Sequence, residues 1–205
     1  MSKNSMQCPL CQASKPTLFY QQDSVSSYIC SHCDLLFKDK YLAPAEEQAR
    51  YEKHNNDLED PRYLNYLDQL WSLRPDDVEF KTVLDFGCGP TRGLEKLAKE
   101  YCVDSYDSYF YPLELKKYDL VFCCEVVEHF NRPKVSWKTL SSVTKNILLL
   151  RTELYTQAEY KNWYYKDDPT HVCFYSYKTL ELMEEWFGLK LLDSKDDNKF
   201  IFKKL

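Results

Sequence analysis

Hydrophobic and polar residues alternate in blocks along the chain, and these blocks predict secondary structure. After residue 81, short apolar runs typical of buried strands alternate with segments whose apolar residues recur every three or four positions, as on one face of a helix. The predicted strands are 82–86, 102–106, 118–124 and 146–150, and the predicted helices are 92–101, a segment around 137–143, and 177–187. This order predicts an α/β fold with a mostly parallel, doubly wound sheet and helices on both faces.

The two ends of the chain carry a different pattern. Apolar pieces at 189–192 and 199–203 flank the polar residues 193–198, which predicts an antiparallel C-terminal hairpin. Residues 44–76 have a helical pattern, with Asp60 and Pro61 suited to the N-cap and first turn of a helix. The first 42 residues hold only short strand-like pieces, at 17–20 and 27–29.

Composition narrows the class of protein. With 205 residues, 44% of them hydrophobic, the chain can bury a core, and no apolar run is long enough to cross a membrane. Residues 1–5 lack the apolar segment of a signal peptide, and nine cysteines without such a signal predict a reducing, cytoplasmic location. The net charge of −5 lies entirely in residues 1–80, which carry 8 basic and 13 acidic side chains. This charge disfavours nonspecific nucleic-acid binding.

Four of the cysteines form two C-x-x-C pairs separated by 18 residues: Cys8, Cys11, Cys30 and Cys33. This spacing predicts a closed, structural zinc site. His32 offers a substitute ligand; four unrelated buried thiols or a redox pair are the alternatives. We therefore expect a zinc ribbon at 1–42, a helical connector at 43–78 and a Rossmann-like domain at 79–205.

Glycine is rare, yet three of the four glycines, Gly87, Gly89 and Gly93, lie within seven residues. They follow a predicted strand and precede a predicted helix, which is where a doubly wound sheet binds a nucleotide-like ligand. Their G-x-G-x-x-x-G spacing differs from the dinucleotide fingerprint, and Asp85 would repel a pyrophosphate but attract an ammonium group. A nicotinamide-dependent oxidoreductase is therefore disfavoured.

The stretch from Asp85 to Gly93 resembles motif I of class I S-adenosylmethionine-dependent methyltransferases, although Gly93 comes two places late for the third glycine. The resemblance implies an S-adenosylmethionine site formed by Asp85, Gly87, Cys88, Gly89, Pro90, Tyr106, Asp107, Ser108 and Glu125. Asp107, 20 residues after Gly87, would bind the ribose hydroxyls; the alternative is an acid in a strand-end turn. Residues 107–118 leave little room for the family's third strand and helix.

Residues 118–129 resemble the family's fourth strand, which implies that Glu125 and His129 face the reactive end of the cofactor. Read alone, Glu125–His129 is a solvated strand-end loop. The aromatic segment 151–176 follows the last parallel strand and is expected to cover the acceptor side of the site. Its His171 is the main candidate for a catalytic base; the alternative is a structural histidine held by hydrogen bonds.

The whole chain, through residues 50–56 and 163–176, also resembles a bacterial group of small methyltransferases with an N-terminal zinc ribbon. We thus expect a cytoplasmic methyltransferase acting on a small-molecule acceptor, with no membrane association. An RNA methyltransferase that uses its ribbon for recognition, and a non-catalytic cofactor-binding interaction protein, are the alternatives. The acidic ribbon half disfavours the RNA reading. The sequence does not predict an oligomeric state.

Overall fold

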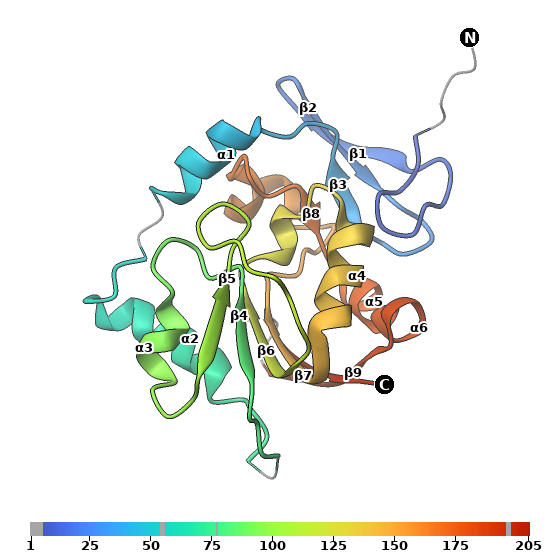
Figure 1. Ribbon diagram of the computed structural model, residues 1–205. Helices are drawn as coiled ribbons and strands as arrows, with labels where there is room; N and C mark the ends of the chain where they lie inside the picture. The colour runs from blue at the N-terminus through green and yellow to red at the C-terminus, as the bar shows by residue number, and fades with distance from the viewer. Residues whose placement is uncertain (1–5, 54–55, 77, 196–197) are drawn as a thin grey trace.

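The computed structural model describes residues 6–53, 56–76, 78–195 and 198–205 (Figure 1). Its strands are β1 (Thr17–Gln22), β2 (Val25–Ile29), β3 (Leu36–Lys38), β4 (Val83–Phe86), β5 (Val103–Tyr106), β6 (Tyr118–Cys124), β7 (Thr144–Arg151), β8 (Cys173–Phe174), β9 (Leu189–Lys195) and β10 (Lys199–Lys204). Its helices are α1 (Pro44–Tyr51), α2 (Pro61–Trp71), α3 (Gly93–Leu97), α4 (Pro133–Val143), α5 (Tyr177–Glu181) and α6 (Met183–Phe187). Short 3-10 helices are η1 (Val127–His129), η2 (Tyr160–Asn162) and η3 (Tyr164–Asp167).

The central sheet has the strand order β5-β4-β6-β7-β10-β9. Strands β5, β4, β6 and β7 are parallel, whereas β10 pairs antiparallel with both β7 and β9. The predicted mostly parallel sheet with an antiparallel C-terminal hairpin is therefore confirmed. Two predictions concern residues outside the described part of the chain. They are the hairpin turn at residues 196–197 and the lack of a signal peptide at residues 1–5.

Side chains on the central strands alternate between two apolar cores. On β6, Leu120 and Phe122 pack with α2 and α3, while Val121 and Cys123 pack with α4, α5 and α6. Helices thus cover both faces of the sheet, with α2 and α3 on one side and α4, α5 and α6 on the other (Figure 1). Every residue of β6 from Tyr118 to Cys123 is buried, and the strand has a continuous apolar run from Leu120 to Cys123.

A second sheet joins the N-terminal segment to the late aromatic loop, in the order β1-β2-β3-β8. Strand β3 pairs antiparallel with β8 through Leu36 and Phe174, and through Phe37 and Cys173. The sequence pattern predicted β1 and β2 but neither β3 nor β8. Within the first 42 residues, the cysteines, Leu10, Leu35 and Phe37 belong to the core of the α4 face, whereas Leu36 packs with tyrosines of the late loop. The three-part division of the chain remains a prediction.

Helix lengths differ from the predictions. Helix α3 ends at Leu97 rather than at 101, because Ala98 leaves the helical conformation (φ −93°, ψ 48°) so that the chain can turn into β5. The predicted helix 177–187 is two helices that meet at Leu182, and it ends as predicted at Gly188 (φ 62°). The segment 44–76 holds two helices, the second capped as predicted by Asp60, whose side chain accepts from the Arg62 amide. Between β5 and β6 there is an isolated bridge, Asp107–Tyr111, and neither strand nor helix.

No helix among the described segments has the length and apolar character needed to span a bilayer.

Candidate functional site

A cleft of about 890 Å³ opens where β4, β5 and β6 end at the carboxyl edge of the sheet. All the residues predicted to bind the cofactor or to act on the acceptor line it: Asp85, Gly87, Cys88, Gly89, Pro90, Tyr106, Asp107, Ser108, Glu125, His129 and His171. Ligands of open α/β sheets bind at this edge, because the strand ends leave a crevice between their loops.

The glycine loop is held in place by backbone contacts. The amides of Gly87 and Cys88 both donate to the Tyr106 carbonyl oxygen, at 2.7 and 3.1 Å. Gly87 has φ 78°, and a Cβ built on it would lie 2.4 Å from a methyl group of Val126. This position therefore requires glycine for both conformation and space. Gly89 also has a positive φ, 60°, but a Cβ there would meet only the Asn56 amide, at 3.7 Å.

Gly93 has a different role from the first two glycines. A Cβ at Gly93 would lie 2.5 Å from Leu67 and 3.0 Å from the Tyr63 hydroxyl, so this glycine lets α2 pack against the start of α3. Asp85, near the end of β4, is 5% exposed, and burial raises its pKa to about 7. A buried acid of this kind gains from a cationic ligand in the cleft.

Asp107 connects the ends of β4 and β5. One carboxylate oxygen accepts from the amides of Tyr109 and Phe110, at 2.8 and 3.3 Å, and the other accepts from the Gly89 amide at 3.2 Å. The strand-end turn that was the alternative reading is thus present, and the same carboxylate also faces the cleft. The two readings are compatible, because each carboxylate oxygen has two acceptor sites.

Glu125 follows β6 in a left-handed conformation (φ 55°), uncommon for a residue with a side chain. Its carboxylate accepts from the hydroxyls of Tyr66, at 2.7 Å, and Tyr165, at 2.8 Å. The Nε atom of Arg151, at the end of β7, lies 3.7 Å from Oε1 of Glu125. Burial raises the Glu125 pKa despite these three groups, which favour the ionised form.

Glu128, three residues on, is fully buried. Its two carboxylate oxygens accept from the hydroxyls of Tyr165, at 2.7 Å, and Thr152, at 3.0 Å. Burial and the charge of Glu125 raise its pKa well above the ordinary value. Because the Tyr165 phenol has one hydrogen, it donates to one of the two carboxylates at a time, and the contact with the other requires a proton on that carboxyl group.

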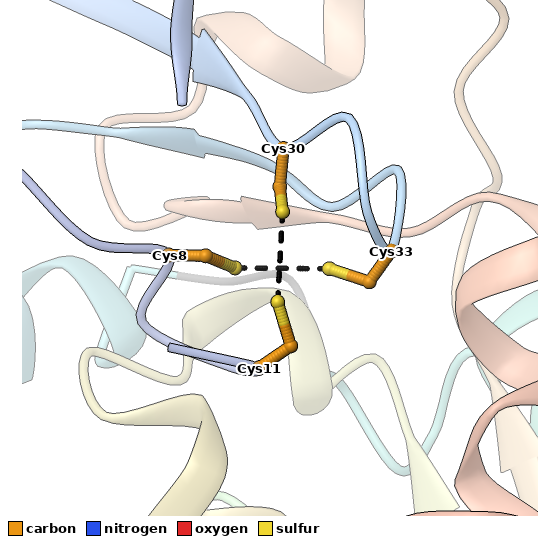
Figure 2. A group of neighbouring side chains, drawn as sticks. All are labelled: Cys8, Cys11, Cys30 and Cys33. Carbon is orange, nitrogen blue, oxygen red and sulfur yellow. Dashed lines mark hydrogen bonds between the residues drawn. The ribbon is translucent and has the colours of Figure 1, made fainter. Parts of the chain in front are cut away.

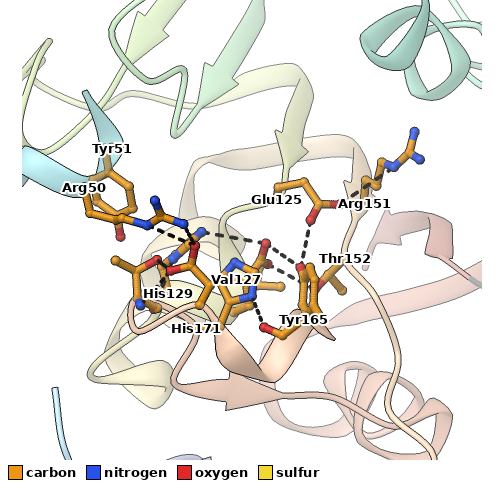
Figure 3. Close-up of polar contacts among 12 residues, drawn as sticks. Arg50, Tyr51, Glu125, Val127, His129, Arg151, Thr152, Tyr165 and His171 are labelled. Carbon is orange, nitrogen blue, oxygen red and sulfur yellow. Dashed lines mark hydrogen bonds and ion pairs between the residues drawn. The ribbon is translucent and has the colours of Figure 1, made fainter. Parts of the chain in front are cut away.

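His129 and His171 lie side by side in the wall of the cleft, with ring centroids 4.7 Å apart (Figure 3). The Nδ1 atom of His129 is 3.1 Å from the Thr170 carbonyl oxygen, and Nδ1 of His171 is 2.7 Å from that of Tyr165. A carbonyl only accepts, so each ring donates from Nδ1 and carries its lone pair on Nε2. His171 thus has the backbone hydrogen bond of the structural reading and also lines the cleft.

Helix α1 forms a wall of the cleft that the sequence did not predict. Arg50 donates to Asp168 at 2.7 Å, and Glu47 accepts from the hydroxyls of Tyr51, at 2.6 Å, and Tyr109, at 2.8 Å. The Arg50–Asp168 pair lines the cleft together with the two histidines, and the His171 amide donates to the Asp168 carbonyl oxygen at 3.2 Å. Of the residues that the sequence missed, Arg151 alone carried a usable signal, namely its position at the end of a parallel strand next to β6.

The four paired cysteines converge as predicted from their spacing. The Sγ atoms of Cys8 and Cys33 are 3.7 Å apart, and those of Cys11 and Cys30 are 3.5 Å apart, so that the two pairs cross (Figure 2). Sulfurs about 2.3 Å from one zinc ion at the corners of a tetrahedron lie roughly 3.8 Å apart. The residue after each pair, Gln12 or Asp34, has a positive φ, 63° or 57°, which gives the two turns the same shape. The geometry and donor set fit zinc.

The cysteine-containing segment also holds the late loop. The buried Lys38 amine donates to the carbonyl oxygens of Lys166, at 2.7 Å, and Asp168, at 3.0 Å, on either side of the turn that leads to His171. The Tyr155 hydroxyl donates to the Asp34 carbonyl at 2.6 Å, and Thr179 donates to that of Cys33 at 2.8 Å. The position of His171 therefore depends on residues more than 130 positions earlier in the chain.

Comparison with known proteins identifies a family for the chain. Residues 59–194, two thirds of the chain, match a family model described as a methyltransferase domain. No curated protein matches the chain.

Solved structures with a similar fold share little sequence. Magnesium protoporphyrin IX methyltransferase from Synechocystis PCC 6803, with bound SAH, has a TM-score of 0.52 and 16% identity over 82% of this chain and 90% of its own. The N-methyltransferase NodS of Bradyrhizobium japonicum WM9, in complex with S-adenosylhomocysteine, has a TM-score of 0.52 and 13% identity over 78% and 97%. A chain from the complex of the Haloferax volcanii Trm112 methyltransferase activator with a methyltransferase has a TM-score of 0.56 and 11% identity over 77% and 97%. The fold is thus that of S-adenosylmethionine-dependent methyltransferases.

Proposed function

Because the chain belongs to the methyltransferase domain family, we propose that it transfers the methyl group of S-adenosylmethionine to a small-molecule acceptor. The observation that carries the proposal is one cleft with two different ends. One end is the glycine loop with Asp85 and Asp107, and the other holds Glu125, His129 and His171. The nine cysteines, none of them in a disulfide, support a reducing, cytoplasmic setting.

The cofactor end suits each part of S-adenosylmethionine. The loop from Gly87 to Pro90 admits the methionine part close to the backbone, and the buried Asp85 supplies a negative charge for its ammonium group. Asp107 keeps acceptor capacity for the ribose hydroxyls, and Tyr106 and Ser108 flank it on the cleft wall.

The acceptor end suits a nucleophile that must lose a proton. In the proposed reaction, the acceptor atom forms a bond to the methyl carbon while the carbon–sulfur bond breaks, and S-adenosylhomocysteine leaves. His171 and His129 would activate the acceptor, and Glu125 would orient it. The zinc ion proposed at Cys8, Cys11, Cys30 and Cys33 would be structural, because four thiolates leave no open position.

Binding of S-adenosylhomocysteine, measured by calorimetry on the zinc-loaded full chain, tests the proposal. We expect binding of this ligand and none of NAD. Asp107→Ala should weaken binding by about 1–3 kcal/mol, because a ribose hydroxyl loses its partner. Asp193→Ala, an exposed acid on β9, serves as the matched control and should bind like the wild type. Binding of NAD, or wild-type affinity in the Asp107 variant, would contradict the proposal.

A further inference from the structure

Three side chains in the cleft wall bring together metal-binding atoms. Glu128, His129 and His171 each offer one donor atom, and these atoms all lie within 4.8 Å of one another. Two of them, His129 Nε2 and Glu128 Oε1, are 3.8 Å apart. We propose that this cluster binds one divalent transition-metal ion, at a site separate from the four cysteines.

The surroundings of the three side chains fit ligands to a metal. A metal-binding histidine usually donates its other ring N–H to a carbonyl or carboxylate, which fixes the ring and its tautomer. Both histidines do so from Nδ1, to the Thr170 and Tyr165 carbonyls. The carboxylate of Glu128 is held in the same way, by the hydroxyls of Tyr165 and Thr152. All three donors are thus oriented by a second layer of hydrogen bonds.

Charge and burial favour a cation here. Glu128 is fully buried, and an ionised carboxylate in such a place needs a cation or a metal ion beside it; otherwise the group takes up a proton. The Tyr165 hydroxyl that contacts Glu128 also contacts the carboxylate of Glu125, so that a second acid lies close to the cluster. A divalent ion would compensate both.

The donor set indicates the class of ion. Two imidazoles and one carboxylate suit Zn²⁺, Fe²⁺, Co²⁺ or Mn²⁺, whereas Ca²⁺ and Mg²⁺ take oxygen ligands. His129 and His171 line the cleft, so acceptor atoms could complete the coordination there. This last step rests on the proposed function. It specifies an acceptor whose oxygen or nitrogen atom binds the metal ion. The two imidazoles would then hold the ion, and the ion would activate the acceptor.

Titration with Mn²⁺ tests the site, because Mn²⁺ prefers carboxylate and imidazole to thiolate and leaves a zinc-loaded cysteine site occupied. The full chain is loaded with a single zinc ion per chain, which the four thiolates hold, so that the cluster stays open to Mn²⁺. By electron paramagnetic resonance we then expect one bound Mn²⁺ per chain. Glu128→Gln keeps the shape of the side chain but removes the charge; its amide oxygen still accepts from one of the hydroxyls of Tyr165 and Thr152, while its NH2 group donates to the other. This substitution should weaken Mn²⁺ binding at least tenfold. His171→Ala should do the same.

His32→Ala is the matched control, since His32 is exposed and stacks on Trp186 in the cysteine-containing segment. This variant should bind Mn²⁺ like the wild type.

The absence of Mn²⁺ binding at millimolar concentration, or unchanged binding in both cluster variants, would overturn the metal site. If the variants unfold, the Co²⁺ absorption of the zinc-loaded wild type decides: weak bands without sulfur charge transfer support the site, and no bands refute it. If the chain binds S-adenosylhomocysteine but no Mn²⁺, only this inference is refuted. If it binds Mn²⁺ but no S-adenosylhomocysteine, only the proposed function is refuted.

Discussion

The two ends of the cleft are built in opposite ways. The cofactor end uses residues 85–107, close in sequence, and its loop is held by backbone amides such as those of Gly87 and Cys88. At the acceptor end, side chains from distant parts of the chain meet, as Lys38 meets the Asp168 carbonyl and Tyr66 meets Glu125. A local, backbone-built site leaves a motif in the sequence, whereas a site built from distant side chains leaves none.

The difference also predicts different sensitivities. The cofactor end is formed mainly by β4, β5 and their loops, which pack on α2 and on Val126 after β6 and have no contact with the cysteine-containing segment among those described above. The acceptor end depends on the cysteine-containing segment, through the β3–β8 pairing and the Lys38 hydrogen bonds. Disrupting the four-cysteine cluster should therefore disturb the acceptor end and leave the cofactor end intact.

Cys30→Ser should have the largest effect, because it would remove a ligand of the proposed zinc ion and metal binding is coupled to local folding. We expect loss of stoichiometric zinc and faster amide exchange both in residues 6–42 and in the late loop around β8, with S-adenosylhomocysteine affinity retained. Hydrogen-exchange mass spectrometry, metal analysis and calorimetry measure these three quantities. A rise in exchange that stops before residue 43 would show that the acceptor loop does not depend on the zinc site.

His171→Ala should lower turnover by about 10²–10⁴-fold once an acceptor is found by screening for methyl transfer, because the acceptor would lose its activating group. Cofactor affinity should not change, since the cofactor end lacks this side chain. His32→Ala provides the comparison for removal of an imidazole outside the cleft. A variant that loses thermal stability but keeps its specific activity would assign His171 a structural role.

Asp85→Asn should change stability and cofactor binding in opposite directions. The Asp85 pKa of about 7 lies above the ordinary 3.8, so the folded chain holds a proton that the unfolded chain releases, and the wild type loses stability as pH rises from about 4 to 7. Removing the acid should raise the free energy of unfolding at pH 8 by up to about 4 kcal/mol, with little gain near pH 4. S-adenosylmethionine affinity should fall about tenfold or more, because the ammonium group loses its counter-charge.

Asp119→Asn is the control of opposite sign. Lys145 and the amides of Lys81 and Thr82 lower the Asp119 pKa, so this substitution should destabilise the fold near neutral pH. Denaturant unfolding followed across pH 4–8 measures both variants. A gain from Asp85→Asn that does not vary with pH would contradict the assigned cause.

The sequence predicted those parts of the molecule whose structure depends on near neighbours. The bounds of strand β6 were predicted to the residue. Asp85, Asp107 and Glu125 were expected at one site because each lies at the carboxyl end of a predicted parallel strand, and all three line the cleft. Strands β3 and β8 were missed because strands of three and two residues carry too short a pattern and form only through pairing, of β3 with β2 and β8, and of β8 with β3 across the chain. Glu128 had no local signal either, since its burial and its Thr152 contact arise only when β7 lies beside β6.

The β3–β8 pairing also sets an order of events during synthesis. Leu36 leaves the ribosome roughly 140 residues before its partner Phe174, which at about 5–20 residues per second is a delay on the order of 7–30 s. Throughout that time one edge of β3 has no partner and can pair with another chain. With three residues ending in Lys38, the edge is short and ends in a charge, two features that limit such pairing. The four cysteines are thus available early, while the late loop that pairs with β3 is completed only near the end of synthesis.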